Sequence, residues 1–179
     1  MAILRVLLLS LLLVAAAAHP QAAASLERHV KAAYLYNFAK FVEWPASAAL
    51  DTTALLVCVL GDDVFADVVE QTVQGKTANG RPVTVRRDPD AQHLKACHVL
   101  FIGAAEQKRL SRLLEAVAGS GVLTVSDAER FAHLGGIINF IVEGNKVQFE
   151  VNVDAAARSR LRISSRLLQV ARVVRDEGK

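Results

Sequence analysis

The stretch Ala54-Leu-Leu-Val-Cys-Val-Leu60, closed by Gly61, decides the fold class of this chain. All its residues are apolar and the run has the length of a strand, which is typical of a strand buried on both faces of a sheet. The pattern returns at Ala96-Cys-His-Val-Leu-Phe-Ile102 before Gly103, and in shorter form at Val122-Leu-Thr-Val125. These runs predict central strands of the kind found in parallel sheets.

Helical segments separate the predicted strands. Asp62 and Asp63 can cap a helix that reaches about Thr72, and residues 104–118 carry leucines toward one side and charges toward the other. Pro82-Val-Thr-Val-Arg86 has the pattern of a further strand near an edge of the sheet. Strands that alternate with helices predict a single α/β domain with a mostly parallel sheet flanked by helices.

The pattern changes after Gly135-Gly136. Residues 137–142 and 146–151 flank a Glu143-Gly144-Asn145 turn, which predicts a β-hairpin near the C-terminus. Polar residues alternate with apolar ones in the second arm, so one face of this strand is expected to be buried and the other to be available to a partner.

A final helix is expected to begin at Asp154, with apolar inner positions that continue to Val174. Its outer side would carry a row of arginines, which is usually a solvated helix face. Residues 176–179 are expected to form a frayed tail. The arginines of the row are Arg158, Arg162 and Arg166.

Residues 1–24 have the pattern of a secretory signal peptide, with the apolar run Val6 to Ala18 behind a basic residue. The run is shorter than the roughly twenty residues that span a bilayer. Candidate cleavage sites follow Ala18 or fall within Ala22 to Ala24. We therefore expect a periplasmic protein whose folded domain is residues 25–175.

The composition and the net charge indicate which classes of partner the protein is expected to bind. The net charge is +3, a small imbalance that argues against a polycationic surface and a nucleic-acid partner. No later segment is long and apolar enough for a membrane span, so the mature protein is not expected to be membrane-embedded. In an oxidising compartment Cys58 and Cys97 form either a disulfide or two buried free thiols, and both readings are open on this ground.

The sequence carries no motif that points to catalysis, a cofactor or a metal. Glycine-rich nucleotide fingerprints, a nucleophile elbow and metal-ligand spacings are missing. We interpret Asp62 and Asp63 as helix caps and His98 as a hydrogen-bonded core histidine. His133 is a weak candidate for a pH-responsive contact. We therefore expect no enzymatic activity.

Three stretches together carry a family resemblance. The first is the aromatic-rich Lys31-Ala-Ala-Tyr-Leu-Tyr-Asn-Phe-Ala-Lys-Phe-Val-Glu-Trp-Pro45, an apolar-sided helix that its proline ends. The second combines residues 135–140 with 147–152, and the third is Ile163-Ser-Ser-Arg-Leu-Leu168. In this order behind a signal peptide, they resemble the YfiR family. The resemblance implies an α/β periplasmic domain without known catalysis.

The resemblance also bears on covalent and quaternary structure. It favours a disulfide between Cys58 and Cys97, because the family has a cysteine pair at similar spacing in the corresponding strands. A second family pair near the Gly-Gly segment has no counterpart here. The family is often dimeric, so a homodimer is expected, with the hairpin or the first helix as a source of a two-fold interface.

By resemblance, the expected function is regulation of signalling. The protein would bind the periplasmic sensor part of an inner-membrane GGDEF diguanylate cyclase, keep cyclic-di-GMP low, and be sequestered by an outer-membrane OmpA-like lipoprotein. Glu150 falls where the family has a partner-sensitive acidic residue. The expected partner-binding residues are Gln148, Glu150, Asn152, Arg158 and Arg162.

Two alternatives stay open. A periplasmic small-molecule sensor would bind its ligand beyond the carboxyl ends of the strands, near Gly61-Asp62, Gly103-Ala104 and Ser126-Asp127. An accessory protein of another exported sensory system is the second alternative. Ligand-dependent stabilisation would favour the first of these, and neighbouring genes for a kinase or transporter the second.

Overall fold

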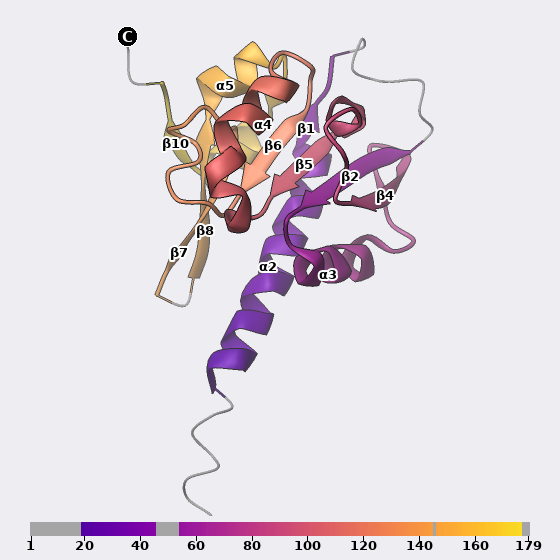
Figure 1. Cartoon of the computed structure of the whole chain (residues 1–179), viewed down its shortest axis with the longest axis vertical. Helices are drawn as coiled ribbons and strands as arrows, with labels where there is room; N and C mark the ends of the chain where they lie inside the picture. Colours follow the sequence, from indigo (N-terminus) through magenta and orange to yellow (C-terminus); the bar gives the residue numbers. More distant parts are fainter. Residues whose placement is uncertain (1–18, 46–53, 145, 177–179) are drawn as a thin grey trace, which may run out of the picture.

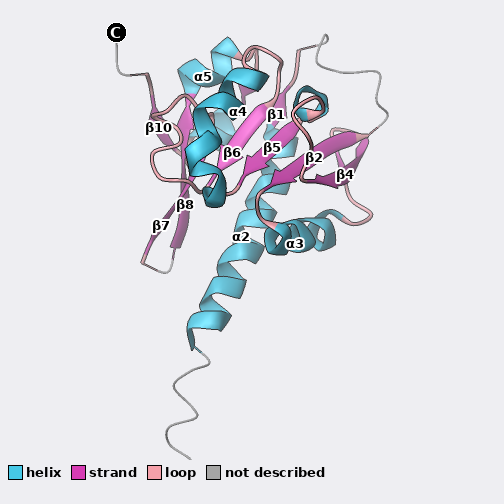
Figure 2. Ribbon diagram, in the orientation of Figure 1, coloured by secondary structure: helices cyan, strands magenta, loops and turns pink. Residues whose placement is uncertain are grey.

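The predicted buried strands lie together in one eight-stranded sheet (Figures 1 and 2). The structure, a computed structural model, describes residues 19–45, 54–144 and 146–176. The strands are β2 (Leu55–Leu60), β3 (Thr77–Ala78), β4 (Arg81–Arg87), β5 (Val99–Ile102), β6 (Leu123–Ser126), β7 (Ile138–Glu143), β8 (Lys146–Asn152) and β10 (Arg172–Val174). Their order across the sheet is β10-β8-β7-β6-β5-β2-β4-β3.

Most neighbouring strands run parallel. β4, β2, β5, β6 and β7 pair in parallel succession, and β10 pairs parallel with β8. The β3–β4 and β7–β8 pairs are antiparallel. The predicted α/β class with a mostly parallel sheet is confirmed, as are the β-hairpin and the position of β4 near an edge.

Helices pack on both faces of the sheet. α2 (His19–Phe41) and α3 (Asp63–Val73) lie on one face, and α4 (Leu110–Val117) lies on the other. The Asp62 carboxylate accepts a hydrogen bond of 2.9 Å from the Phe65 amide, which confirms the predicted cap of α3. α4 follows a 3₁₀ segment, Ala104–Arg109, so the predicted helical stretch consists of two parts.

The aromatic stretch of α2 packs against the hairpin. Phe38 is fully buried, and its ring centroid lies 5.0 Å from that of Phe149 and 5.7 Å from that of Phe140. Tyr34, one turn earlier, packs on Phe149 at 5.2 Å. Phe140 and Phe149 are partners across the two arms of the hairpin. Aromatic contacts thus fix helix and hairpin against each other.

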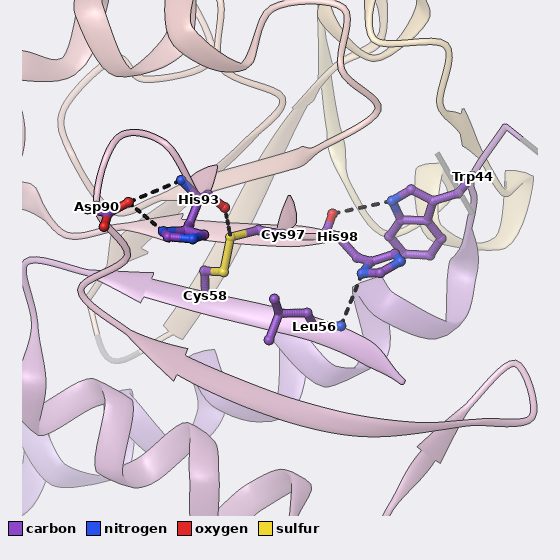
Figure 3. Close-up of a disulfide and its surroundings, with 7 residues drawn as sticks. All are labelled: Trp44, Leu56, Cys58, Asp90, His93, Cys97 and His98. Atoms are coloured by element: carbon purple, nitrogen blue, oxygen red, sulfur yellow. Dashed lines mark hydrogen bonds and ion pairs between the residues drawn. A yellow bond between two sulfur atoms is a disulfide. The ribbon is translucent and has the colours of Figure 1, made fainter. Parts of the chain in front are cut away.

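Cys58 of β2 and Cys97, just before β5, form a disulfide on the other face of the sheet (Figure 3). Their Cα atoms are 5.9 Å apart, an ordinary separation for a bridge. Both residues are buried in the apolar cluster to which α4 contributes Leu110 and Leu113. The predicted disulfide is confirmed, and its burial gives it a structural role.

The expectation of one final helix from Asp154 is wrong. Two short helices, α5 (Val153–Arg158) and α6 (Ser165–Leu168), are separated by β9 (Arg162–Ile163), and β10 follows them. The chain turns at Arg160, whose φ is +58°, and the Ser164 hydroxyl then caps α6. The β-branched Val173 and Val174 continue as a strand beside β8. The arginine row is therefore divided among three elements: Arg158 in α5, Arg162 in β9 and Arg166 in α6.

The N-terminal helix bears on the expected signal peptide. Residues 1–18 lie outside the described residues, as do residues 177–179 of the expected tail. α2 begins at His19, so cleavage after Ala18 leaves it whole, whereas cleavage after Ala24 shortens it by about two turns. None of the described helices combines the length and the hydrophobicity that a bilayer-spanning segment needs.

Candidate partner-binding surface

One row of paired side chains crosses the sheet and changes from apolar to polar toward the C-terminal edge. Strand register places Ile102 beside Ser126, then Asn139, Glu150 and Arg172 in succession. Paired positions share a face of the sheet, so all of them lie on the side of α4. α4 packs over the apolar part of this side. We call the polar residues on the part of this side that α4 does not cover the polar face. They are Asn139, Glu143, Gln148, Glu150, Asn152 and Arg172.

A turn segment, residues 127–136, is hydrogen-bonded to two amides of the polar face. The Asn139 Nδ2 donates to the carbonyl of Ala128 at 3.0 Å, and the Asn152 Nδ2 donates to the carbonyl of Ala132 at 2.8 Å. Phe131, between those carbonyls, is fully buried. The sheet thereby fixes the turn segment near its start and at its centre.

Gly136 lets this segment approach its own aromatic anchor. A Cβ at residue 136 would lie 2.1 Å from Cε1 of Phe131, a separation that no side chain tolerates. Gly135 has a φ of +98°, in the region that favours glycine. The Gly-Gly pair of the sequence thus sets the close packing of the turn segment on β7.

Glu150 lies at the centre of the polar face and is only 9% exposed. A carboxylate oxygen of Glu150 is 3.8 Å from Nε2 of His133 in the turn segment, so the two form an ion pair when His133 is protonated. Burial makes an incompletely paired carboxylate costly. A cation brought by a binding partner would therefore find a favourable contact here.

Gln148 and Arg172 form the exposed part of the polar face. One guanidinium nitrogen of Arg172 donates to the Glu143 carboxylate at 3.1 Å and to Oε1 of Gln148 at 3.4 Å. These bonds join β10 to both arms of the hairpin. The polar groups of these side chains stay exposed at the edge of the sheet, and they do not cover that edge.

Asn152 has a structural role in the interior of the protein. It is fully buried, donates to Asp176 at 2.9 Å, and accepts a hydrogen bond of 2.8 Å from the Ala155 amide as the cap of α5. Asp176 also pairs with Arg158. The hydrogen bond from Asn152, followed by the Arg158 contact, holds the pKa of Asp176 below its ordinary value.

The structure brings together Gln148, Glu150, Asn152 and, through Asp176, Arg158. Arg162 lies apart in the two-stranded sheet of β9 and β1 (Val42–Glu43), where its side chain is 86% exposed and 3.8 Å from Glu43. The expectation that the whole polar side of β8 is open differs from the structure, because Glu150 and Asn152 are buried.

Sequence reasoning missed Arg172 and Asp176 as members of this region. The expected final helix had included Arg172, and Asp176 had been assigned to the tail. The run Arg172-Val-Val174 was the available signal, since it has the composition of a strand. Asp176, the first residue of the expected frayed tail, has hydrogen-bond partners on Asn152 and Arg158.

The crevice beyond the carboxyl ends of the strands is occupied by α2. The Lys31 ammonium lies 2.9 Å from Asp127, which follows β6, and 2.6 Å from Glu27. Burial opposes its charge, but the hydrogen bonds to Glu27 and Asp127 outweigh this and raise the pKa of Lys31. The hollow left there measures about 150 Å³, smaller than the ligand pockets of roughly 300 Å³ or more that are usual in proteins.

His98 is the hydrogen-bonded core histidine that the sequence predicts (Figure 3). Its Nδ1 accepts from the Leu56 amide at 3.1 Å, and Trp44 donates to its carbonyl at 3.3 Å. Burial, and secondarily the charge of Arg81, lower the pKa of His98 to about 4. Within the described residues, no three His, Cys, Asp or Glu side chains are grouped to hold a metal ion.

Comparison with known protein families agrees with this architecture. The model of the YfiR/HmsC-like family matches residues 28–172, from the third turn of α2 to the start of β10. This protein belongs to the YfiR/HmsC-like family. The resemblance seen in the three sequence stretches is thereby confirmed.

Membership of the YfiR/HmsC-like family gives the polar face a context. The family is regulatory and points to a periplasmic regulator of diguanylate cyclase signalling. The buried disulfide suits an oxidising compartment. A regulatory protein of this kind needs a surface for contact with other proteins. The polar face is a candidate, because it combines a turn segment held in place by hydrogen bonds with the nearly buried carboxylate of Glu150.

Proposed function

We propose that this protein binds the periplasmic sensor part of an inner-membrane GGDEF diguanylate cyclase and represses it, so that cyclic-di-GMP falls. Binding uses the polar face, and repression follows from a higher affinity for the inactive state of the sensor. The protein contributes contacts and no chemical step. The observation that carries the proposal is the incompletely paired carboxylate of Glu150 on a rigid frame.

The candidate residues have different parts in this proposal. Glu150 and Gln148 contact the partner, and Arg158 provides a neighbouring cation through its pairing with Asp176. Asn152 positions the turn segment and α5, since it is fully buried. Arg162, on the separate two-stranded sheet, is an outlying contact.

Release from repression requires a competitor. An OmpA-like lipoprotein of the outer membrane is the proposed one, which sequesters the protein away from the cyclase. Competition for a common surface needs no conformational change in the protein itself. The rigid turn segment, with Phe131 buried and both asparagine bonds in place, suits a surface of fixed shape.

Binding of the purified exported domain to the periplasmic part of the cyclase tests the proposal. Glu150→Lys and Arg158→Glu are each expected to weaken the complex by about tenfold or more, because each reverses a charge at the contact. Glu115→Lys is the matched control for Glu150→Lys, since Glu115 is exposed on α4 and the substitution changes the net charge by the same amount.

If both Glu150→Lys and Arg158→Glu bind the cyclase with near-wild-type affinity, the polar face is not the binding surface. If Glu115→Lys weakens binding as much as Glu150→Lys does, the loss of affinity is due to net charge and not to the polar face. Circular dichroism of every variant shows whether the fold is kept, which is expected for the exposed Arg158 in particular.

A further inference from the structure

The two edges of the eight-stranded sheet differ in how they are protected. At one edge α2 contacts β3: the Tyr36 hydroxyl donates to the carbonyl of Thr77 at 2.8 Å, and the Asn79 side chain donates to the carbonyl of Ala39 at 3.3 Å. β10 forms the other edge, beside β8 (Figure 2). A strand edge that is left uncovered presents backbone donors and acceptors to any extended chain that meets it.

The hydrogen bonds of β8 show which backbone groups of β10 point outward. The Asn152 amide donates at 2.8 Å to the carbonyl of Ile137, just before β7, so the backbone groups of Asn152 face β7. Successive residues of a strand direct these groups to opposite sides, so those of Val151 face β10. Val151 pairs with Val173 in a parallel register, and its groups bond to the residues on either side of Val173. The amide and the carbonyl of Val173 therefore point away from β8, at the free edge.

β10 is held in place at both ends. The Ala171 amide donates to the carbonyl of Leu168 at 3.3 Å before the strand, and the Asp176 amide donates to the Asp154 carboxylate at 3.1 Å after it. The Asp176 carboxylate also accepts a hydrogen bond of 2.9 Å from the buried Asn152. The edge is thus ordered before a partner arrives, which lowers the entropy lost on binding.

The side chains of β10 indicate the chemistry of a matching strand. Val173 is 46% exposed, although Val151, its neighbour in register, is fully buried. Arg172 lies on the opposite face with its side chain 51% exposed. Within the described residues, its bonds to Glu143 and Gln148 use one guanidinium nitrogen, so it has further donors to offer. A strand beside β10 would therefore carry apolar side chains on one face and acidic ones on the other.

We infer that β10 is a docking edge for strand addition, and that its occupant is an extended segment from the periplasmic part of the cyclase. The segment adds as a further strand of the sheet, exchanges backbone hydrogen bonds with Val173, and places an acidic side chain beside Arg172. This contact continues directly from the polar face, to which Arg172 belongs. The inference rests on the proposed function for the identity of the partner.

Two proline variants of the free protein test the direction of the backbone groups. Val173→Pro removes an outward amide, and proline is tolerated where the N–H of an edge strand faces solvent. Val174→Pro removes an amide that bonds to β8. We expect Val173→Pro to keep the wild-type melting temperature within about 3 °C and Val174→Pro to lower it by about 5 °C or more. Equal losses in the two variants would contradict the position of the Val173 amide at the free edge.

Binding to the purified periplasmic part of the cyclase tests the occupant. Val173→Pro is expected to weaken the complex by about tenfold, because an acceptor on the incoming strand loses its donor. Val173→Thr keeps the amide and a β-branched side chain, so it is the matched control and is expected to stay within about threefold of the wild type. Hydrogen exchange gives an independent readout, since the Val173 amide is expected to exchange at least about tenfold more slowly in the complex.

The outcomes separate the inference from the proposed function. A wild type that does not bind the cyclase would overturn both. If Glu150→Lys weakens the complex but Val173→Pro binds like the wild type and the Val173 amide stays unprotected, the partner binds without strand addition and the inference alone is wrong. Equal weakening by Val173→Thr would attribute the loss to the side chain and overturn it as well. So would loss of self-association in Val173→Pro with unchanged cyclase binding, because the edge would then belong to a second copy of this chain.

Discussion

The ammonium group of Lys31 on α2 lies 2.9 Å from the carboxylate of Asp127, which follows β6. This contact joins residues that are 96 positions apart in the chain. It places the opening helix across the carboxyl ends of the strands, where many α/β proteins bind ligands. Asp127 also accepts a hydrogen bond of 3.1 Å from the Ala104 amide, so a single carboxylate connects α2, β6 and the segment before α4.

Replacement of Lys31 by methionine is expected to lower the free energy of unfolding by about 1 to 3 kcal/mol. The change keeps the length of the side chain but leaves Asp127 and Glu27 without their shared cation. Urea denaturation measures the loss. Lys108→Met, at an exposed position, is the control and is expected to change stability by less than about 0.5 kcal/mol. If both variants lower the free energy of unfolding equally, the contact between Lys31 and Asp127 has no particular structural role.

The stability of the protein is expected to fall as the pH decreases from about 6.5 to about 4, in part through His98. Its folded-state pKa is about 4, whereas the unfolded chain titrates near 6.5. Between these values the unfolded state binds more protons, which favours unfolding as the pH falls. The contribution of this one group is on the order of 3 kcal/mol at most.

Comparison with a His98→Gln variant isolates that contribution. Carboxylates such as Asp176, whose pKa is also lowered, lose their stabilising effect at still lower pH in both proteins. The variant is therefore expected to show a shallower dependence of unfolding free energy on pH between about 4 and 6.5. Parallel curves for the two proteins would mean that His98 takes up its proton without cost to the fold.

Removal of the disulfide by a Cys58→Ser, Cys97→Ser double change is expected to cost about 3 to 4 kcal/mol. The bridge closes a loop with a sequence separation of 39 and both thiols are buried, so solvation of the serine hydroxyls adds to the loss. A Cys58→Ala, Cys97→Ala variant separates the two effects. Thermal unfolding with and without reductant should show the loss in the wild type only; a reductant-insensitive wild type would contradict the account.

Gly136→Ala is expected to destabilise the protein by roughly 1 to 3 kcal/mol, because the added Cβ displaces the ring of Phe131. That displacement should also move His133 away from Glu150 and weaken partner binding without any change of charge. Gly75→Ala is the contrast, since the space around it is open and its positive φ alone carries a cost of about 1 kcal/mol. Unaltered stability of Gly136→Ala would show that the turn segment yields easily.

The features that the sequence predicted correctly are those with local causes. The run Leu55 to Leu60 forms a buried strand because every residue is apolar and a glycine ends it. Asp62 caps α3 because its carboxylate reaches an amide three residues later. The hairpin follows from its alternation and its turn residues.

The C-terminal region depends on contacts that the local pattern does not encode. Residues 159–174 have leucine spacing compatible with a helix, yet β8 offers an open edge that Arg172, Val173 and Val174 fill as a strand. Burial of Glu150 and Asn152 likewise requires the turn segment, which folds over them from earlier in the chain. The sequence predicts candidate site residues from their residue types, but it does not predict whether their side chains are exposed to solvent.

Cellular cyclic-di-GMP, measured after deletion of the gene and after its restoration, tests the central claim most directly. The account predicts a rise on deletion that the wild-type gene reverses and that Glu150→Lys, expressed at an equal level, does not. An unchanged level on deletion under several growth conditions would contradict repression of a diguanylate cyclase, and full restoration by Glu150→Lys would contradict the role of the polar face.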